Sequence, residues 1–151
     1  MNPGGSTPII LTPETEIEIA HQRAYQYDIT TQTPRNAADP DGYLIRSHLA
    51  KMIVNYMSNV RNRKPDLTKD CSPFAASIQS ESLELQQYMT LSCQYNIMGI
   101  HPDQTPLSDF LPNDIVSRAE FGTVLSRILR GDTYNDSDPY YAKHLQALKE
   151  N

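Results

Sequence analysis

The sequence predicts an all-α fold, made of tandem helix–loop–helix repeats around a small helical bundle with long irregular loops. The first observation is an apolar stripe at helical spacing between residues 121 and 129, which is typical of one helix face. The second is a complete helix-start signal just before the stripe. The third is a less well preserved repeat of this segment 72 residues upstream, which indicates two copies of one helical unit. The stripe consists of Phe121, Val124, Leu125, Ile128 and Leu129, and its upstream counterpart of Leu49, Met52, Ile53, Tyr56 and Met57.

The first copy is expected over residues 14–66, after a flexible N-terminal tail of residues 1–13. Thr12 followed by a proline and a glutamate predicts a helix start, since proline is tolerated at the first helical position, and this helix should run to about Asp28. A loop over residues 30–43, with Pro34, Pro40 and Gly42, then leads to a second helix beginning near Ile45. This second helix lacks the capping serine and glutamate of the better copy, so the first copy is a degenerate one.

The second copy spans residues 67–131 and is the better preserved one. We expect a helix from Glu81 to Met98, capped by Ser80 and ended by Gly99. A proline-marked loop over residues 101–114 follows. Phe110 is the only large aromatic residue in this loop, so it should anchor the loop to the helix pair.

The next helix has the clearest start in the chain. The Ser117 hydroxyl can accept the amide of Glu120, and the Glu120 carboxylate can reach back to the amide of Ser117, which makes a capping box. Val116 and Phe121 occupy the positions of a hydrophobic staple around this box. The far end is marked by two basic residues that suit the negative helix terminus and by a glycine; these are Arg127, Arg130 and Gly131.

A third copy is expected to begin over residues 132–151 with a short amphipathic helix. Its apolar and aromatic positions are Tyr140, Tyr141, His144, Leu145 and Leu148. Two interpretations are open: the helix completes a core of three units, or the chain is part of a longer protein. The second is the one we favour from the sequence.

Three segments of the second copy together resemble the S-layer homology (SLH) domain family. They are Gln94-Tyr95-Asn96-Ile97-Met98-Gly99-Ile100, Phe110-Leu111-Pro112-Asn113 and Ser117-Arg118-Ala119-Glu120-Phe121. Ser117 replaces the family's usual threonine and keeps the capping hydroxyl, and Cys71-Ser72-Pro73-Phe74 resembles the lead-in of a family repeat. Two features depart from the pattern: Ala76 replaces an aspartate, and the loop glycines between Ile100 and Phe110 are missing.

The resemblance implies that the chain binds a cell-wall glycan, often an acidic one, through the arginine of the second helix start. A guanidinium presents a planar fork of donors to a carboxylate or to paired sugar oxygens, and free amides at a helix start favour an anion. Arg118 is therefore the first candidate, oriented by Ser117 and Glu120, with Asn113 and Asp114 adding hydrogen bonds to the sugar. Arg46 is the equivalent residue of the first copy and the last candidate.

Each candidate also has a purely structural interpretation. Ser117 and Glu120 are fully explained as a capping box. Arg118 could pair with Asp114 on the surface, a contact that contributes little to stability. Arg46 is better explained as structural. The tyrosines could stack on sugar rings, although packing against the bundle is the favoured role; these are Tyr134, Tyr140 and Tyr141.

Composition and motifs exclude several other classes of protein. A chain of 151 residues supports one compact domain, and its net charge of −5 argues against a nucleic-acid partner. No segment is apolar enough to cross a membrane, and the sequence carries no pattern of a catalytic, cofactor or metal site. We therefore expect a protein that is not an enzyme, has no cofactor and no metal, and does not insert into membranes.

Cys71 and Cys93 are too few for a disulfide scaffold. They could pair and tie the lead-in segment to the helix that follows, or remain free with one thiol buried and one exposed. Sequence alone does not place their Cβ atoms within bonding range, so both interpretations stay open.

Two functional hypotheses follow. In the first, the chain is an extracellular module that anchors an exported bacterial protein to wall polysaccharide at the cell surface. In the second, it has lost glycan binding and serves as an assembly element that holds other subunits of a surface layer or appendage. No secretion signal is visible in residues 1–13, so the resemblance implies that a leader was removed and that the chain is trimmed.

Overall fold

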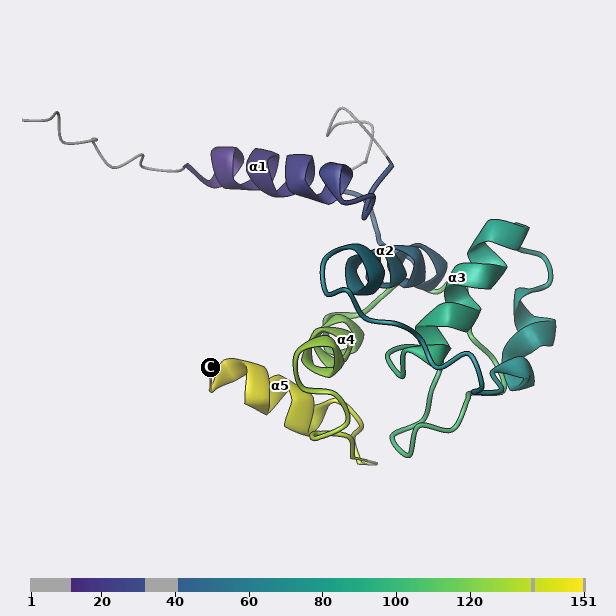
Figure 1. The fold of residues 1–151 in the computed structure, drawn as a ribbon. Helices are drawn as coiled ribbons and strands as arrows, with labels where there is room; N and C mark the ends of the chain where they lie inside the picture. Colours follow the sequence, from purple (N-terminus) through teal and green to yellow (C-terminus); the bar gives the residue numbers. More distant parts are fainter. Residues whose placement is uncertain (1–11, 32–40, 137, 151) are drawn as a thin grey trace, which may run out of the picture.

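The computed structural model describes residues 12–31, 41–136 and 138–150. Within these residues the chain is all-α, with six helices and no strands, as the sequence predicts (Figure 1). The helices are α1 (Pro13–Gln26), α2 (Arg46–Asn59), the 3₁₀ helix η2 (Ser72–Ile78), α3 (Leu83–Gln94), α4 (Arg118–Arg130) and α5 (Ala142–Lys149). Most of the expected N-terminal tail, and the part of the first loop that holds Pro34 and Pro40, lie outside the described residues.

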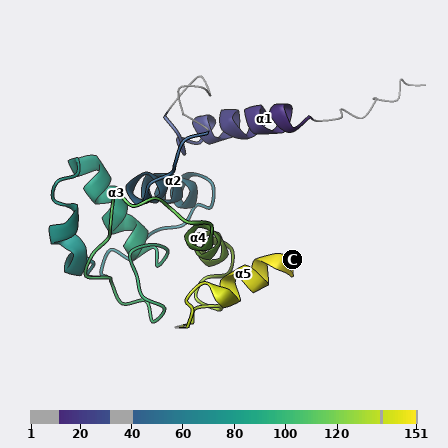
Figure 2. The ribbon, with the colours of Figure 1, turned by 180° about the vertical axis from the view of Figure 1, so that it is seen from behind.

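Helix α1 starts as predicted. The Thr12 hydroxyl accepts a hydrogen bond from the amide of Thr15 at 3.2 Å, and a proline follows in the first turn. None of the residues of α1 is buried, and the helix projects away from the rest of the fold in both ribbon views (Figures 1 and 2). The turn after it is held by α2, because Asn59 and Asn55 donate to the backbone carbonyls of Tyr27 and Asp28.

Helix α2 begins without a capping side chain, and backbone carbonyls from the second copy take its place. The amides of Arg46 and Ser47 donate to the carbonyls of Asp114 and Pro112 at 3.0 and 2.9 Å. These bonds satisfy donors that the missing capping residue would otherwise serve. The loop before α4 is therefore fixed to the start of α2.

The core lies between α2, α3, η2 and the loop that precedes α4. Phe110 and Phe74 are fully buried and meet edge to face, with their ring centroids 5.2 Å apart. The expected anchoring role of Phe110 is confirmed. Gly99 packs against both rings with a φ of +70°, and a Cβ atom there would lie 2.9 Å from Phe110.

Helix α3 is shorter than the sequence predicts. Its cap is Ser82, whose hydroxyl accepts the amide of Leu85, and its last residue is Gln94. The predicted cap, Ser80, was wrong because the turn after η2 extends to Glu81, whose amide donates to the carbonyl of Ile78. At the other end, Asn96 has a φ of +58°, so the helix ends before Gly99 is reached.

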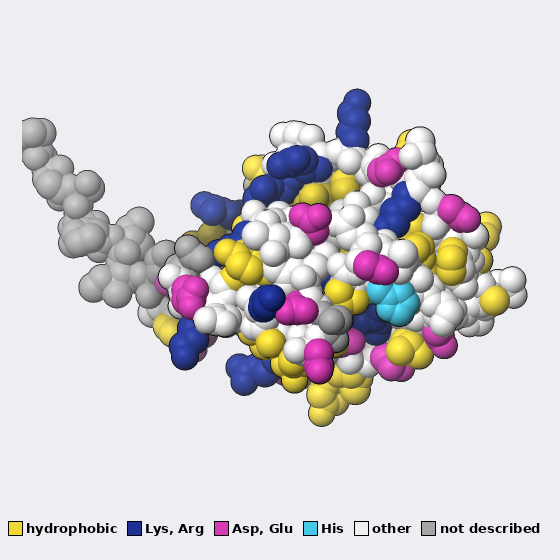
Figure 3. Space-filling model, turned by 90° about the horizontal axis from the view of Figure 1, so that it is seen from below, with side chains coloured by type: hydrophobic (Ala, Val, Ile, Leu, Met, Phe, Trp, Pro, Cys, Tyr) yellow, Lys and Arg dark blue, Asp and Glu magenta, His cyan; other side chains and the backbone are white. Residues whose placement is uncertain are grey.

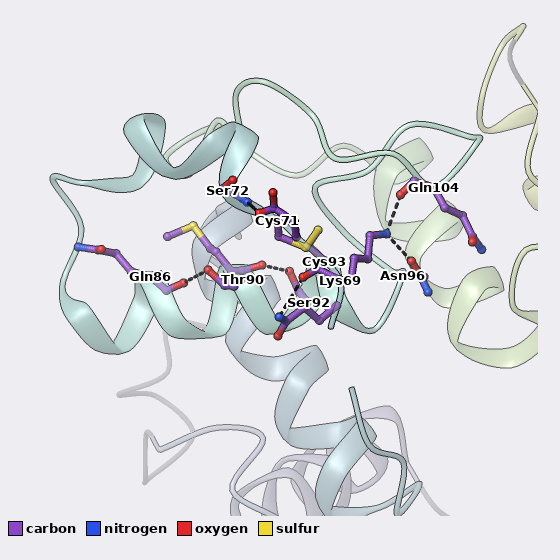
Figure 4. The surroundings of a disulfide bond; sticks show 12 residues. Lys69, Cys71, Ser72, Gln86, Thr90, Ser92, Cys93, Asn96 and Gln104 are labelled. Atoms are coloured by element: carbon purple, nitrogen blue, oxygen red, sulfur yellow. Dashed lines mark hydrogen bonds between the residues drawn. A yellow bond between two sulfur atoms is a disulfide. The ribbon is translucent and has the colours of Figure 1, made fainter. Parts of the chain in front are cut away.

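Cys71 and Cys93 form a disulfide bond, which resolves the alternative left open by the sequence (Figure 4). Both residues are buried, and their Cα atoms are 6.3 Å apart. The bond ties the start of η2 to α3. Beside it, the Lys69 ammonium donates to the Asn96 side chain and to the carbonyl of Gln104, so the loops on both sides of α3 are held together.

The start of α4 matches the prediction in detail. The Ser117 hydroxyl accepts from the Glu120 amide at 3.1 Å, and Glu120 Oε2 accepts from the Ser117 amide at 2.9 Å. The two bonds form the expected capping box.

The apolar stripe of α4 is divided between the core and the surface, since Val124 is buried and Ile128 packs against the core. Phe121, Leu125 and Leu129 are 46%, 36% and 47% exposed, and we call these three residues the outer stripe. Apart from Val124, the buried residues lie on the more polar side of the helix, and they are Gly122, Thr123, Ser126 and Arg127. The physical reason is α5, which packs on this polar side.

The contact between α4 and α5 depends on small residues. A Cβ atom on Gly122 would lie 2.2 Å from Leu145 Cδ2, so a larger residue there would require the Leu145 side chain to move. One turn further along α4, Ser126 Oγ and His144 Nδ1 form a buried hydrogen bond of 2.7 Å. Helix α5 therefore rests on α4 and leaves the outer stripe uncovered.

Candidate functional site

A cavity of about 230 Å³ lies where the start of α2 meets α4 and the loop after α3. Its floor is apolar, and its polar lining comes from two arginines, a glutamate, a tyrosine, a threonine and a histidine. The lining residues are Arg46, Leu49, Ile97, Met98, Gly99, Ile100, His101, Pro102, Leu107, Leu111, Val116, Glu120, Thr123, Val124, Arg127 and Tyr140.

Arg46 is held on one wall of the cavity by three contacts. Its Nε donates to the carbonyl of Phe110 at 2.8 Å, and its Nη1 donates to Glu120 Oε1 at 2.9 Å. The guanidinium also lies over the Phe110 ring, 5.2 Å from the centroid. The charge of Arg46 is thus balanced by Glu120.

Arg127 projects from the buried side of α4 and is only 8% exposed. Its Nε donates to Asn135 Oδ1 at 3.1 Å and its Nη1 to the carbonyl of Ile97 at 2.9 Å. Both acceptors are neutral, and no carboxylate of the described chain lies within ion-pair distance. Burial lowers the pKa of Arg127 to about 10, so the guanidinium is still charged at neutral pH.

Asn135 contacts Arg127 directly, and His144 holds Asn135 in place. Asn135 Oδ1 is within bonding distance of both Arg127 Nε and His144 Nε2, the latter at 2.9 Å. Since that oxygen can only accept, Nε2 of His144 carries the hydrogen and Nδ1 accepts from the Ser126 hydroxyl. Burial, and then the charge of Arg127, lower the pKa of His144, which favours this neutral tautomer.

Tyr140 lies at the same cavity and remains a phenol. Burial and the negative charge of Glu120 raise the pKa of Tyr140, while Arg46 and Arg127 act in the opposite direction and are outweighed. The hydroxyl is therefore a neutral donor and acceptor beside a cation. Together, Arg127 and Tyr140 can bind a carboxylate or another small oxyanion.

The residues predicted from the sequence divide between the cavity and the surface. Arg46 and Glu120 line the cavity. Ser117 is exposed and caps α4, and Asn113 donates to Glu81 Oε1 at 2.8 Å. The backbone carbonyl of Asp114 accepts from the amide of Arg46.

Arg118 is exposed and lies outside the cavity lining. Within the described residues it has no ion pair, so the expected surface contact with Asp114 is not formed. It lies at the start of α4, three residues before Phe121, on the same face as the outer stripe. The structure therefore does not bring Arg118 together with Arg46 and Glu120.

Arg127 and Tyr140 are the site residues that the sequence did not reveal. Arg127 has a sufficient local explanation as a basic residue near a helix C-terminus. Its burial depends on α5 and on the turn that carries Asn135, which are tertiary features. Tyr140 was one of three tyrosines considered for sugar stacking, and no sequence signal distinguished it from Tyr134 and Tyr141.

The described part of the chain offers neither a metal cluster nor a membrane-spanning helix. It contains no group of three or more histidine, cysteine, aspartate or glutamate side chains placed to hold a metal ion. None of its helices has the length and apolarity needed to cross a lipid bilayer. On the face seen from below, acidic and basic side chains are interspersed (Figure 3).

Comparison of the chain with known protein families, with curated proteins and with solved structures gives no match.

Proposed function

We propose that this chain is a non-catalytic module that binds an acidic cell-wall polysaccharide and holds an exported bacterial protein at the cell surface. The observation that carries the proposal is Arg127, a buried guanidinium with no carboxylate partner in the described chain, lining a cavity. An isolated buried charge is costly, and an anionic ligand is what would compensate it. Its Nη2 group has no acceptor among the described residues and is available for that ligand.

The size of the cavity supports a ligand group no larger than one sugar residue. At about 230 Å³ it is smaller than the roughly 300–1,000 Å³ of pockets for drug-sized molecules. The apolar floor suits the carbon face of a sugar ring, and Arg127 and Tyr140 suit its acid group. A long polysaccharide would then place a single acidic residue in the cavity, with the rest of the chain outside.

Two other observations are consistent with a wall-binding module of SLH type. Helices α2 and α4 begin at Arg46 and Arg118, at the spacing of the sequence repeat. The disulfide between Cys71 and Cys93 fits a protein that works outside the cytoplasm.

Co-sedimentation with purified bacterial cell walls tests the proposal. The wild-type protein should pellet with the walls, and amidation of the wall carboxylates should release it. Arg127→Met should weaken binding about 10–100-fold, which corresponds to the loss of one charge-assisted hydrogen-bonded contact. Arg127→Lys keeps the charge and loses the planar fork, so its wall affinity should lie between those of the wild type and of Arg127→Met.

Arg118→Ala is the matched control on the surface. If the cavity is the site, Arg118→Ala binds as the wild type does, with the same helical circular dichroism. If Arg118→Ala loses binding and Arg127→Met keeps it, the glycan is bound at the start of α4, as the sequence resemblance implies. Unchanged binding by both variants would rule out both arginines as the site, and a wild-type protein that does not pellet with the walls would remove the anchoring function.

Subunit assembly is the second candidate, and one observation favours it. The outer stripe of α4 exposes three large apolar side chains in a row, a surface that commonly marks an interface.

A further inference from the structure

The two halves of the chain use equivalent positions in different ways. Leu49, Ile53 and Met57 of α2 are 2%, 3% and 9% exposed. The residues 72 positions further along the sequence are Phe121, Leu125 and Leu129, the outer stripe of α4. Three positions that are buried in the first copy are therefore uncovered in the second.

In the first copy the cover for these positions comes from α3 and the turn after it. Met89 and Ile97 are 0% and 1% exposed and belong to the same core cluster as Leu49, Ile53 and Met57. This packing joins the second helix of one unit to the first helix of the next unit.

The counterparts of Met89 and Ile97 are uncovered as well. Subtracting 72 gives Ile17 and Tyr25 of α1, which are 49% and 46% exposed; helices α1 and α3 themselves start 70 positions apart, at Pro13 and Leu83. Both sides of the α2–α3 interface thus have a second version in the chain, on α4 and on α1, and neither version is buried.

We propose that α1 of one protein molecule packs on the outer stripe of α4 in a second molecule, in the way that α3 packs on α2 within the chain. The contact would bury Ile17 and Tyr25 against the outer stripe. Each molecule would use α1 to bind one neighbour and α4 to bind another, so the association is head to tail. This proposal is independent of the glycan site.

Charge and accessibility favour α1 as the occupant. Helix α1 carries three glutamates and one arginine, whereas the exposed charged residue at the start of α4, beside the outer stripe, is Arg118, and Glu120 is already paired with Arg46. Two α4 helices packed on each other would instead bring like charges together. Helix α1 buries no residue in its own chain and projects from it (Figure 1), so a second copy can reach it without disturbing the core.

Sedimentation velocity of the full chain over a wide concentration range tests the proposal. The monomer has a mass of 17.1 kDa, and the wild type should form larger species as its concentration rises. Ile17→Glu removes the α1 side and Leu125→Glu the α4 side, so each variant alone should remain monomeric. Leu83→Glu, at a residue that is 82% exposed and on neither surface, is the control and should associate as the wild type does.

Mixing the two variants gives the sharpest outcome. The Ile17→Glu copy keeps an intact α4, and the Leu125→Glu copy keeps an intact α1, so a one-to-one mixture should form heterodimers and nothing larger. A wild type that stays monomeric at all concentrations would overturn the proposal. So would a mixture that stays monomeric, or an Ile17→Glu variant that still associates by itself. Circular dichroism of each variant confirms that it is folded before the result is used.

Discussion

Arg46 Nη1 lies 2.9 Å from Glu120 Oε1, so the first residue of α2 is paired with the third residue of α4. The other oxygen of the same carboxylate closes the capping box with the amide of Ser117. One side chain therefore stabilises the start of its own helix and neutralises the arginine that begins the equivalent helix of the other copy. The ion pair also forms part of the cavity wall, and it leaves Arg127 as the unbalanced charge there.

Removal of the Glu120 carboxylate should destabilise the fold from both helix starts. We expect Glu120→Ala to lower the free energy of unfolding by about 2–4 kcal/mol, from the lost cap and the lost charged hydrogen bond. Glu120→Gln keeps an acceptor and should lose less. Urea unfolding measures both variants, with Arg118→Ala as a neighbour expected within about 0.5 kcal/mol of the wild type. Equal stability of Glu120→Ala and Arg118→Ala would show that the double role is not energetically important.

The disulfide should contribute about 3 kcal/mol. Its cysteines are separated by 22 positions, and closure of a loop of this length in the unfolded chain accounts for a stabilisation of that size. Urea unfolding with and without a reducing agent should reveal the difference. A double variant, Cys71→Ser with Cys93→Ser, should be less stable and insensitive to the reducing agent. Identical unfolding curves for the reduced and oxidised wild type would contradict the prediction.

Alanine substitutions at two glycines distinguish the effect of backbone strain from that of packing. Both Gly99 and Gly131 have positive φ, so an alanine at either position should cost about 1–3 kcal/mol in strain. Only at Gly99 would the new Cβ lie within 3 Å of the Phe110 ring, whereas nothing lies within 4 Å at Gly131. Gly99→Ala should therefore lower Tm clearly more than Gly131→Ala does. Similar losses would mean that the aromatic pair can shift without penalty.

Stability should fall on acidification because of His144. Burial and Arg127 hold the pKa of His144 below its ordinary value of 6.5, so the unfolded chain takes up this proton more readily than the native one. The contribution of neutral His144 to the free energy of unfolding is complete above its ordinary pKa. It is lost as the pH falls from there toward the lower pKa of the native state. The decrease in the free energy of unfolding between pH 7 and pH 5 should thus be smaller in His144→Gln. An unchanged decrease in this variant would assign the pH dependence to other groups.

The local parts of the fold could be predicted from the sequence. The capping box of Ser117 and Glu120 involves residues three positions apart, and the start of α1 at Thr12 has the same short range, so both are encoded in neighbouring side chains. The burial of Phe110 also followed from its being the only large aromatic residue in a polar loop. In contrast, the start of α3 was misplaced by the turn that ends η2.

The features that the sequence did not predict depend on contacts between distant segments. The apolar stripe of α4 identified one face of the helix, but α5 packs on the other side, where Leu145 lies against Gly122. The same packing buries Arg127 beside Asn135 and His144. Periodicity identifies the apolar side of a helix and does not identify which side a neighbour covers. The candidate site is for this reason mostly a tertiary feature, and only Arg46 and Glu120 of its charged residues were among the sequence candidates.

The most direct test of the account is an NMR titration of the arginine Nε–H signals with a glucuronic acid oligosaccharide. Arg127 Nε is held by Asn135, and Arg118 is exposed and unpaired within the described chain, so the two signals report on the cavity and on the surface. We predict a saturable shift of the Arg127 signal at ligand concentrations that leave the Arg118 signal unchanged. A saturable shift of Arg118 with an unperturbed Arg127, or no shift of either, would contradict the assignment of the cavity as an acidic-glycan site.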